Sequence, residues 1–482
     1  TSGNLIKTTG SELGKDSIIY TYEYDMLGNL LSSIGNGIEN SYEYDNLNRL
    51  IAVKTNNSDF ETQIAYLYTG KDLMQMSTTR FNSSGMGYTV AREDYTYNET
   101  GYLDSKTISN FEGNFIDETE IYSTEYGYGY DSNGNLKYMY EGTHGDDIIC
   151  SQFSVFTYDL SNRIKKINTS KESQNASYRI TIRDEKYKYS LDGKLTSKEI
   201  DIIQNFDDDI EDYVTRNYFT NYEYNNAGAI ISEENGILNN GVNNLNCKTL
   251  YSYDLYGNRV SEQKTDYTNS SNNSLTTYTY NAANRLISKN TSNSNASSQS
   301  TYTYDFSGNL LSSNTVRNSS NVQTTETTTY AYDTLNRTSA ITKNGIETSF
   351  KYDENNRRVS KTTGENKILY VWNNDQVLYE VNSNNSQQNN YLIWGIGGEL
   401  EGVFKNGKPF VNTLDLTGNV VNSLNLCDHT EYEVQYDAFG NITYGQTLTS
   451  IGYSGEYMDV ETGLYYLKAR YYDPELGRFT QE

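Results

Sequence analysis

The stretch Tyr22-Glu23-Tyr24-Asp25-Met26-Leu27-Gly28-Asn29-Leu30 contains the unit that decides the fold, and a related stretch, Val434-Gln435-Tyr436-Asp437-Ala438-Phe439-Gly440-Asn441-Ile442, lies near the other end of the chain. Twelve more copies lie between them. The position of Asp25, here called the aspartate slot, is filled in successive copies by Asp25, Asp45, Thr69, Asn98, Asp131, Asp159, Ser190, Asn225, Asp254, Asn281, Asp305, Asp333, Asp353 and Asp437. Tyrosine precedes the slot in every copy, and a second aromatic residue stands two positions earlier except in the last copy, which has Val434. Residues two apart share one face of a strand, so each copy is predicted to be a strand that runs into a turn.

The residue three positions after the slot supports the turn. It is glycine in eight copies, asparagine in five and Asp72 in one. These residue types tolerate a left-handed backbone, and a short polar side chain in the slot can bond the backbone two residues on. Each unit is therefore predicted to be strand, tight turn and strand. The residues taken to represent these turns are Tyr24, Asp25, Gly28, Tyr44, Asp45, Asn48, Tyr130, Asp131, Gly134, Tyr253, Asp254, Gly257, Tyr304, Asp305 and Gly308.

The spacing of the copies predicts one continuous sheet. Over the first thirteen copies the spacing runs from 20 residues, between Asp25 and Asp45, to 35 residues, between Ser190 and Asn225. Such variation is typical of hairpins whose far loops differ in length while the turn end stays the same. A lone hairpin is only marginally stable in water, so successive hairpins should pair with one another. Because no Pro-rich or Gly/Ser linker interrupts the repeat, the predicted fold class is all-β, in one elongated or closed domain.

The composition limits the classes of function. A net charge of −25 and 35% hydrophobic residues would favour disorder, but 48 tyrosines, many of them in register, argue for a folded chain. The acidic balance makes nucleic acid an improbable partner, because phosphate binding requires clustered Lys and Arg. No run of about 20 apolar residues is present, so no transmembrane segment is predicted. Thr1-Ser2-Gly3 does not open a signal peptide, which leads us to expect a fragment of a longer chain.

Few residues suggest a catalytic site or a metal site. Cys150, Cys247 and Cys427 are too sparse for a disulfide framework or a metal site, and buried thiols are the favoured interpretation. Cys427-Asp428-His429 contains nucleophile and base types but lacks the surroundings of known cysteine enzymes, and His144 is the only other histidine. The acidic run Asp207-Asp208-Asp209, with Glu211 and Asp212, lacks the spacing of a calcium loop and is expected to be solvated. We therefore expect no catalytic residue, no metal and no cofactor in this chain.

The pattern changes after Asp353. The chain closes with Tyr453-Ser454-Gly455-Glu456-Tyr457-Met458-Asp459, followed by Glu461 to Phe479. This ending closely resembles the core terminus of the Rhs family, whose members also carry the tyrosine–aspartate repeat. The resemblance divides the chain into a repeat region, residues 1–360, and a core-terminal segment that closes a shell, residues 361–482. The core-terminal motif consists of Arg470, Tyr471, Tyr472, Asp473, Pro474, Gly477, Arg478 and Phe479.

The resemblance implies a spiral of β-hairpins that forms a hollow shell or part of one, as in insecticidal toxin complexes and teneurins. In bacterial members the shell encloses a variable C-terminal toxin, which an aspartyl-type self-cleavage separates from the core. The implied partner is thus the toxin domain of a parent chain, and the implied location is secreted, at the cell surface or associated with the cell wall. We expect neither the toxin nor the scissile bond within the present 482 residues.

Two alternatives remain open at this point. The chain could instead be an adhesion module whose exposed tyrosines and acidic loops bind carbohydrate or a cell-surface receptor. The second alternative is a hydrolase, and only Cys427 and His429 suggest it. Within the core-terminal motif, Arg470, Asp473 and Arg478 are the candidates for a role beside the cleavage region, although ion pairs and a turn at Pro474 would explain them equally well.

Overall fold

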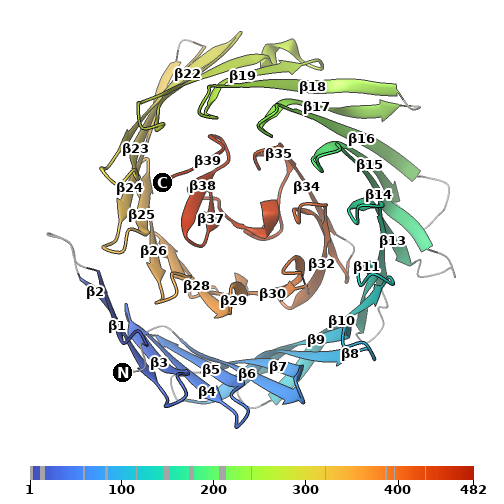
Figure 1. Cartoon of the computed structure of the whole chain (residues 1–482), viewed down its shortest axis with the longest axis vertical. Helices are drawn as coiled ribbons and strands as arrows, with labels where there is room; N and C mark the ends of the chain where they lie inside the picture. Colours follow the sequence, from blue (N-terminus) through green and yellow to red (C-terminus); the bar gives the residue numbers. More distant parts are fainter. Residues whose placement is uncertain are drawn as a thin grey trace. The chain divides into compact units, whose positions relative to one another are not determined.

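A computed structural model describes residues 4–10, 17–57, 60–81, 85–114, 117–144, 151–172, 179–205, 213–239, 242–320, 322–385, 388–395, 397–428 and 430–481. Apart from short 3-10 segments such as η1 (Ser270–Asn272) and η3 (Tyr453–Gly455), the regular elements within these ranges are β-strands. The all-β prediction is therefore confirmed. Most of the strands belong to one antiparallel sheet of 35 strands, and four more form a separate small sheet. Figure 1 shows the strands in chain order by colour.

The strands of the first third of the chain are β1 (Lys7–Gly10), β2 (Ile18–Tyr24), β3 (Leu30–Gly35), β4 (Ile38–Tyr44), β5 (Leu50–Asn57), β6 (Glu61–Thr69), β7 (Asp72–Phe81), β8 (Gly87–Tyr97), β9 (Leu103–Asn114), β10 (Asp117–Tyr130), β11 (Leu136–His144) and β12 (Ser151–Tyr158). They are followed by β13 (Ile164–Glu172), β14 (Arg179–Tyr189), β15 (Leu195–Asn205), β16 (Tyr213–Tyr224), β17 (Ile230–Asn239), β18 (Val242–Tyr253), β19 (Arg259–Asp266), β20 (Ser274–Tyr280), β21 (Leu286–Asn293), β22 (Ala296–Tyr304), β23 (Leu310–Ser319) and β24 (Val322–Tyr332).

The later strands are shorter. They are β25 (Thr338–Lys343), β26 (Ile346–Tyr352), β27 (Arg358–Thr363), β28 (Asn366–Asn373), β29 (Gln376–Asn382), β30 (Asn390–Trp394), β31 (Leu400–Lys405), β32 (Lys408–Leu414), β33 (Val420–Asn425), β34 (Glu431–Tyr436) and β35 (Ile442–Gly445). The separate small sheet consists of β36 (Tyr457–Asp459), β37 (Leu464–Leu467), β38 (Arg470–Asp473) and β39 (Arg478–Phe479).

The chain divides into two compact units. Unit 1 consists of residues 1–128, 141–150 and 330–480, and unit 2 consists of residues 129–140, 151–329 and 481–482. The domain boundary predicted at residue 360 lies within unit 1. It stays a prediction, because it rests on a change in the sequence pattern and the two compact units do not test it.

Most of the repeats are hairpins with the predicted turn. Tyr24 pairs with Leu30 across β2 and β3, and a register shift lies between Glu23 and Tyr24. The same shift next to the repeat tyrosine recurs in the hairpins that end at Tyr44, Tyr158, Tyr189, Tyr224, Tyr253, Tyr280, Tyr304 and Tyr352. Such bulges increase the local twist and bend the strand. The turn end of every such hairpin therefore has the same local geometry.

The predicted left-handed residues are confirmed in the turns. Gly28, Asn48, Gly134 and Gly257 have φ values of 91°, 68°, 83° and 84°. The Thr69 copy is different, because Thr69 pairs with Asp72 around a two-residue turn in which Gly70 has a φ of 60°. Asp72 is thus the first residue of β7 rather than the left-handed position that its spacing suggested.

Replacing Gly257 by valine should lower the stability of the fold by about 1–2 kcal/mol or more, because a β-branched residue strongly resists positive φ. No heavy atom lies within 4 Å of an added Cβ at this position, so the effect would come from the backbone alone. The matched control is Gly257→Asn, which places at this position the residue that Asn48 and Asn284 provide in other copies. Thermal unfolding would measure both variants, and equal melting temperatures would contradict the role assigned to this turn.

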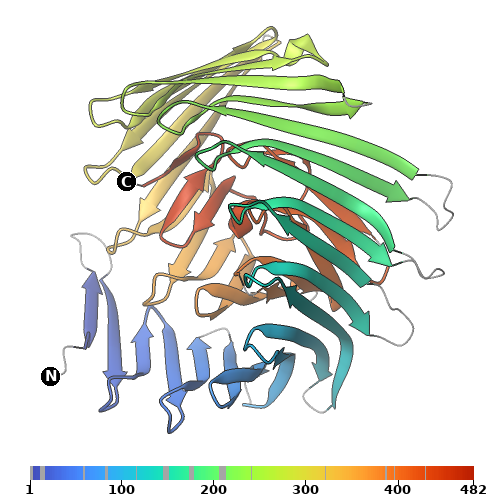
Figure 2. The same cartoon turned by 45° about the vertical axis from the view of Figure 1, so that its right-hand side comes forward.

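The main apolar core of unit 1 lies between the later strands and the small sheet. It contains Tyr352, Tyr370, Leu392 and Val403 from the repeat strands, and Tyr466 and Tyr471 from β37 and β38. Within this unit the later strands also lie beside the early ones, as Figure 2 shows for the orange strands above the blue strands. Tyr20 on β2 donates a hydrogen bond of 2.7 Å to the carbonyl of Tyr352 at the end of β26. Segments more than 300 residues apart are thereby joined.

Candidate functional site: repeat turns and the C-terminal anchor

The aspartate in the slot organises the turn. One carboxylate oxygen of Asp25 accepts hydrogen bonds from the backbone N–H groups of Leu27, at 2.8 Å, and Asn29, at 2.9 Å. Its other oxygen accepts a bond of 2.7 Å from the side-chain amide of Asn29. The bond from Asn29 is the largest influence that lowers the pKa of Asp25 below its ordinary value. The side chain thus closes the turn as an anion, which accounts for the preference for aspartate in the slot.

The same bonds recur in the other turns. The turns of Asp45, Asp131, Asp159, Asp254, Asp333, Asp353 and Asp437 show both backbone bonds to the slot carboxylate. The residue four positions after the slot supplies the side-chain bond, either as asparagine or, as at Arg163, through a guanidinium Nε at 2.8 Å from Asp159. In the Asp305 turn, the slot carboxylate accepts one hydrogen bond from the backbone N–H of Asn309 and another from the side-chain amide of Asn309.

In at least nine copies the repeat tyrosine joins its hairpin to the one before it. The hydroxyl of Tyr44 donates to the carbonyl of Leu30 at 3.1 Å, and the hydroxyl of Tyr253 donates to the carbonyl of Ile230 at 2.8 Å. The same bond is made by Tyr97, Tyr158, Tyr189, Tyr224, Tyr280, Tyr352 and Tyr436. A buried carbonyl left without a partner is costly, so this position requires an aromatic ring with a donor at its far end. We call this series of bonds the tyrosine ladder.

Both tryptophans of the chain continue the tyrosine ladder, which the sequence pattern did not reveal. The indole N–H of Trp372 donates to the carbonyl of Arg358 at 2.8 Å, and that of Trp394 donates to the carbonyl of Val377 at 2.7 Å. Tryptophan has the same combination of a flat apolar body and a terminal donor. The signal was present in Tyr370-Val371-Trp372, where an aromatic residue again stands two positions before the ladder residue.

A further turn of the same type was also missed. Asp415 accepts backbone bonds from Thr417 and Asn419, at 3.0 and 3.2 Å, and Gly418 has a φ of 76°. The stretch Asp415-Leu416-Thr417-Gly418-Asn419 matches the turn pattern, but Leu414 stands where the other copies have tyrosine. The slot and the left-handed residue are thus sufficient for the turn, whereas the tyrosine serves the contact between hairpins.

The C-terminal sheet is held by a buried ion-pair group, here called the C-terminal anchor. Arg358 at the start of β27 contacts Asp459 at 2.5 Å, and Lys361 contacts the other oxygen of Asp459 at 3.1 Å. The side chains of Arg358 and Asp459 are 1% and 0% exposed. Lys361 also contacts the more exposed Glu461 at 3.0 Å. Two cations from a repeat strand therefore hold two carboxylates of the segment around β36.

Aromatic rings surround the guanidinium of Arg358. Its central carbon lies 4.4 Å from the ring centroid of Tyr466, 4.9 Å from Tyr370, 5.4 Å from Phe350 and 5.7 Å from Tyr457. Tyr466 belongs to β37, so the small sheet supplies part of this enclosure. Arginine suits such a site because its planar charge can stack on rings while it donates to a carboxylate.

Charge pairing overcomes the effect of burial at Asp459. Burial alone would raise the pKa of this carboxyl, but Arg358 and Lys361 lower it below its ordinary value. Asp459 is therefore an anion at neutral pH within an enclosed site. The sequence did not single out Asp459 or Arg358, which are 101 residues apart.

The core-terminal motif folds onto the turn of the last repeat. Tyr472 donates to the carbonyl of Phe439 at 3.0 Å, and the carbonyl of Pro474 accepts a bond of 2.9 Å from Asn441. Asp473 caps the following turn by accepting from the N–H of Leu476 at 3.0 Å, and Gly477 has a φ of 65°. Tyr471 lies in the core described above.

The three charged candidates of this motif lie within the β38–β39 hairpin. The guanidinium of Arg470 stacks over the ring of Phe479 at 3.7 Å. Asp473 and Arg478 are directly paired across β38 and β39. A role of these three residues beside a cleavage segment stays a prediction.

The structure describes only some of the other chemical candidates. The N–H of Cys427 donates to the side chain of Asn425 at 2.9 Å, and its thiol is half-buried. Asp428 contacts Lys408 at 3.0 Å, and bonds from Thr430 and Lys408 lower its pKa to about 2. His429, Cys150 and the acidic run at residues 207–212 lie outside the described residues, as does the side chain of His144.

Neither a metal-binding cluster nor a membrane-spanning helix is found in the part of the chain that the structure describes. No group of three or more His, Cys, Asp and Glu side chains there has a geometry that could hold a metal ion. No helix there has the length and apolar character needed to cross a membrane.

The sequence model of the family described as Teneurin YD-shell matches residues 155–482. The chain belongs to the teneurin YD-shell family. The matched YD-shell region includes the later repeat turns, both ladder tryptophans and the whole C-terminal anchor. The resemblance drawn from the repeat and the chain ending is thereby confirmed.

Curated relatives of this YD-shell chain are WapA proteins of Bacillus. The chain is 35% identical over 157 residues to the tRNA3(Ser)-specific nuclease WapA of Bacillus spizizenii and 32% identical over 157 residues to the tRNA nuclease WapA of Bacillus subtilis. The match covers 30% of this chain but only 7% of either relative. Among solved structures, the TcdB2-TccC3 crystal structure matches over 99% of this chain and 30% of that chain, with 14% identity and a TM-score of 0.45.

Proposed function

We propose that this chain is a non-enzymatic wall segment of a secreted polymorphic toxin, which encloses and carries a C-terminal effector that other residues of the parent polypeptide supply. The observation that carries the proposal is the C-terminal anchor. A carrier must hold the segment that leads to its cargo, and Asp459 fastens that segment to a repeat strand through Arg358 and Lys361. Membership of the YD-shell family and the likeness to WapA nucleases support a place in a toxin.

The chemistry of the described residues favours a wall over an active site. The slot carboxylates accept the hydrogen bonds that close the turns, as at Asp25, and the hydroxyls of the repeat tyrosines donate the bonds of the tyrosine ladder. The buried charges of the anchor are paired with one another and enclosed by rings. Groups that are satisfied in this way stabilise a rigid surface but do not offer a reactive atom to a substrate. Under this proposal any nuclease activity belongs to the cargo, and the wall is exported with it.

The test uses a version of the chain that continues beyond Glu482 into its effector. We expect it to cleave itself downstream of the core-terminal motif and to give two bands on a denaturing gel. Under native conditions the two pieces should elute as one species, because an enclosed fragment cannot diffuse away after its peptide link is cut. The enclosed piece should also resist added protease until the wall is unfolded.

The anchor provides the matched variants for this experiment. Asp459→Asn removes the charge that Arg358 and Lys361 hold, and it should increase the release or digestion of the small piece. Asp428→Asn removes an exposed charge that contacts Lys408, and it should behave as the parent protein does. If the two pieces of the unsubstituted protein eluted apart from each other, enclosure would be refuted. A single uncut band would refute self-cleavage, and the protease assay would then decide whether the effector is enclosed.

A further inference from the structure

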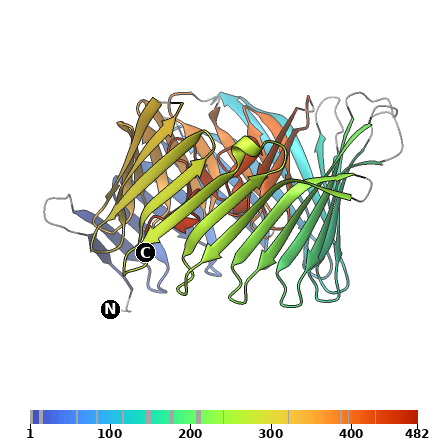
Figure 3. The same cartoon turned by 90° about the horizontal axis from the view of Figure 1, so that it is seen from above.

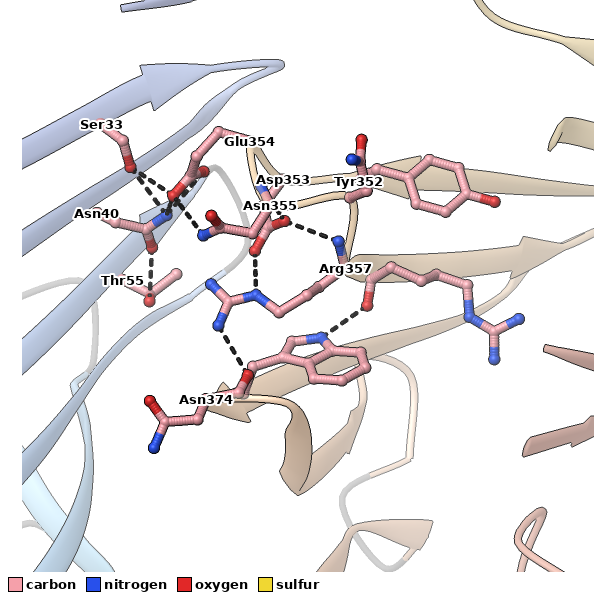
Figure 4. Close-up of polar contacts among 12 residues, drawn as sticks. Ser33, Asn40, Thr55, Tyr352, Asp353, Glu354, Asn355, Arg357 and Asn374 are labelled. Carbon is pink, nitrogen blue, oxygen red and sulfur yellow. Dashed lines mark hydrogen bonds and ion pairs between the residues drawn. The ribbon is translucent and has the colours of Figure 1, made fainter. Parts of the chain in front are cut away.

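Early and late strands of unit 1 meet at a joint that consists mainly of uncharged donors around one carboxylate. Figure 4 shows Glu354, which follows Asp353 in its turn, as it accepts hydrogen bonds from Ser33 at 2.7 Å and from Asn40 at 3.2 Å. Tyr42 donates to the same carboxylate at 3.3 Å. We call this contact the Glu354 joint.

A second joint, between β9, β10 and β31, contains buried charges. Lys106 contacts Glu401 at 2.7 Å and donates a hydrogen bond of 2.5 Å to the carbonyl of Trp394. Tyr128 on β10 donates to the carboxylate of Glu401 at 2.8 Å. The cyan strands β9 and β10 lie beside the orange strands around β31 in Figure 3. One buried carboxylate therefore joins the early and late strands here, and we call this contact the Glu401 joint.

A second carboxyl crowds Glu401. The turn before β31 has Gly395 in the slot, and the N–H of Gly398 donates to the carbonyl of Gly395 at 3.1 Å as in the other repeat turns. With no side chain in the slot, the carboxylate of Glu399 accepts the N–H groups of Gly397 and of its own residue. An added Cβ on Gly395 would meet one oxygen of Glu399 and, at 2.6 Å, one oxygen of Glu401. The two carboxyls therefore lie around the same point.

A third carboxyl of this group comes from β11. Glu141 is 1% exposed. Burial and the charge of Glu401 raise the pKa of Glu141 well above its ordinary value, whereas the charge of Lys106 lowers it. Burial and Glu401 also raise the pKa of Glu399, and Lys106 again acts in the opposite direction. Three carboxyls thus depend on the same lysine.

The tyrosines around the Glu401 joint hold their protons more strongly than free tyrosines do. Burial raises the pKa values of Tyr126 and Tyr128 well above 10. On the neighbouring β8, Glu93 accepts hydrogen bonds from Tyr391 at 2.8 Å and from Tyr95 at 2.7 Å, and burial raises the pKa values of these two tyrosines as well. Below about pH 9, a change of pH therefore acts on the carboxyls of this joint and not on its tyrosines.

We propose that the Glu401 joint is a proton-operated latch, which is closed while Glu141 holds a proton and loosens when that proton is lost. Loss of the proton places another anion near Glu401, in a buried site where Lys106 is already paired. Like charges repel strongly in such a site, because the surrounding dielectric constant is low.

The direction of the pH dependence follows from the raised pKa of Glu141. Such a carboxyl favours the folded state below its unfolded pKa, and the advantage is lost as the pH rises through the folded value. Buried carboxyls titrate at up to about pH 8–9, which sets the upper end of the range. The latch therefore loosens as the pH rises, whereas the Glu354 joint, with its uncharged donors, should stay closed. The inference does not depend on whether the chain encloses an effector.

Hydrogen exchange with mass spectrometry tests the latch on the present chain. Amide protection is measured at about pH 6 and at about pH 9, after correction for the pH dependence of free amides, in peptides that cover β9 and β31. Peptides that cover β3 and β4 report on the Glu354 joint in the same samples. We expect the protection of β9 and β31 to fall about tenfold or more and that of β3 and β4 to change little.

A matched pair of variants makes the test specific. Glu141→Gln keeps the size of the side chain but cannot ionise, so its Glu401 joint should stay protected at about pH 9. Glu39→Gln makes the same change at an exposed carboxyl of β4 and should loosen as the unsubstituted protein does. Infrared spectroscopy adds a measurement that needs no variant. The unsubstituted protein should show the band of a protonated carboxyl at neutral pH, and this band should disappear over the range in which protection is lost.

Four results would overturn the inference. Protection of β9 and β31 could stay constant up to about pH 9, or it could fall equally in Glu141→Gln and in the unsubstituted protein. The band of a protonated carboxyl could be missing at neutral pH. A parallel loss of protection at both joints would show that the whole unit unfolds and that no latch acts at Glu401.

Discussion

Replacing Asp459 by alanine should lower the free energy of unfolding by about 3–5 kcal/mol, the range found when one partner of a buried ion pair is removed. Arg358 is 1% exposed and Lys361 is 4% exposed, so neither cation can turn into water without disrupting the core. Each would remain charged and lose its main counter-ion. Chemical denaturation followed by the fluorescence of Trp372 and Trp394 would measure the loss, because both tryptophans pack against the same core.

The control for this substitution is Asp428→Ala. Asp428 also contacts a lysine, but the two side chains are 45% and 51% exposed, so water replaces the lost contact and stability should hardly change. A small effect at Asp459, similar to that at Asp428, would contradict the role of the anchor.

The contribution of Asp459 should also depend on pH in a defined direction. Its pKa in the folded chain lies below the ordinary value, so its stabilisation is present above that ordinary value and is lost as the pH falls through the folded pKa. The difference in stability between the unsubstituted protein and Asp459→Asn should thus be constant near neutral pH and shrink below about pH 4. A difference that grew on acidification would exclude an ionised Asp459.

Replacing Lys106 by methionine should have the second-largest effect, again about 3–5 kcal/mol at neutral pH. Lys106 on β9 contacts Glu401 on β31 at 2.7 Å, and the two side chains are 2% and 0% exposed. Tyr128 donates to the same carboxylate at 2.8 Å. Glu141, also buried, has a pKa raised well above its ordinary value by burial and by the charge of Glu401, whereas Lys106 lowers it. Without the lysine, this group of buried carboxyls loses the cation that balances it.

Acidification should partly rescue the Lys106→Met variant. A carboxyl whose folded pKa is raised favours folding below its unfolded pKa, and this advantage is lost as the pH rises through the folded value. The unfolding midpoint of Lys106→Met should therefore increase as the pH is lowered from 8 towards 5. Adding Glu401→Gln should restore much of the stability at neutral pH, since it removes the unpaired charge. A stability that is independent of pH, with no benefit from Glu401→Gln, would contradict this account.

The sequence predicted what is local and missed what is distant. Strand, slot and left-handed residue lie within a few positions of one another, so Asp25 and Gly28 revealed the turn without any knowledge of the rest of the fold. Arg358 and Asp459 could not be paired in this way, because 101 residues separate them and no local pattern connects one with the other. Trp372 was overlooked for another reason. The sequence pattern required a tyrosine before the slot. The fold requires only a long flat side chain that ends in a hydrogen-bond donor, and tryptophan also provides this.

The tyrosine ladder gives the repeat a direction. Each ladder hydroxyl donates to a carbonyl of the preceding hairpin, as Tyr44 does to Leu30 and Tyr436 does to Val420. In all the ladder bonds named above, the acceptor comes earlier in the chain than the tyrosine. During synthesis, a hairpin that emerges from the ribosome therefore meets its acceptor already in place. The sheet can grow from its N-terminal end by adding one finished unit at a time, without waiting for distant residues. The long-range contacts must form later than the ladder, because Lys106 meets Glu401 and Arg358 meets Asp459 only after those distant segments have been made.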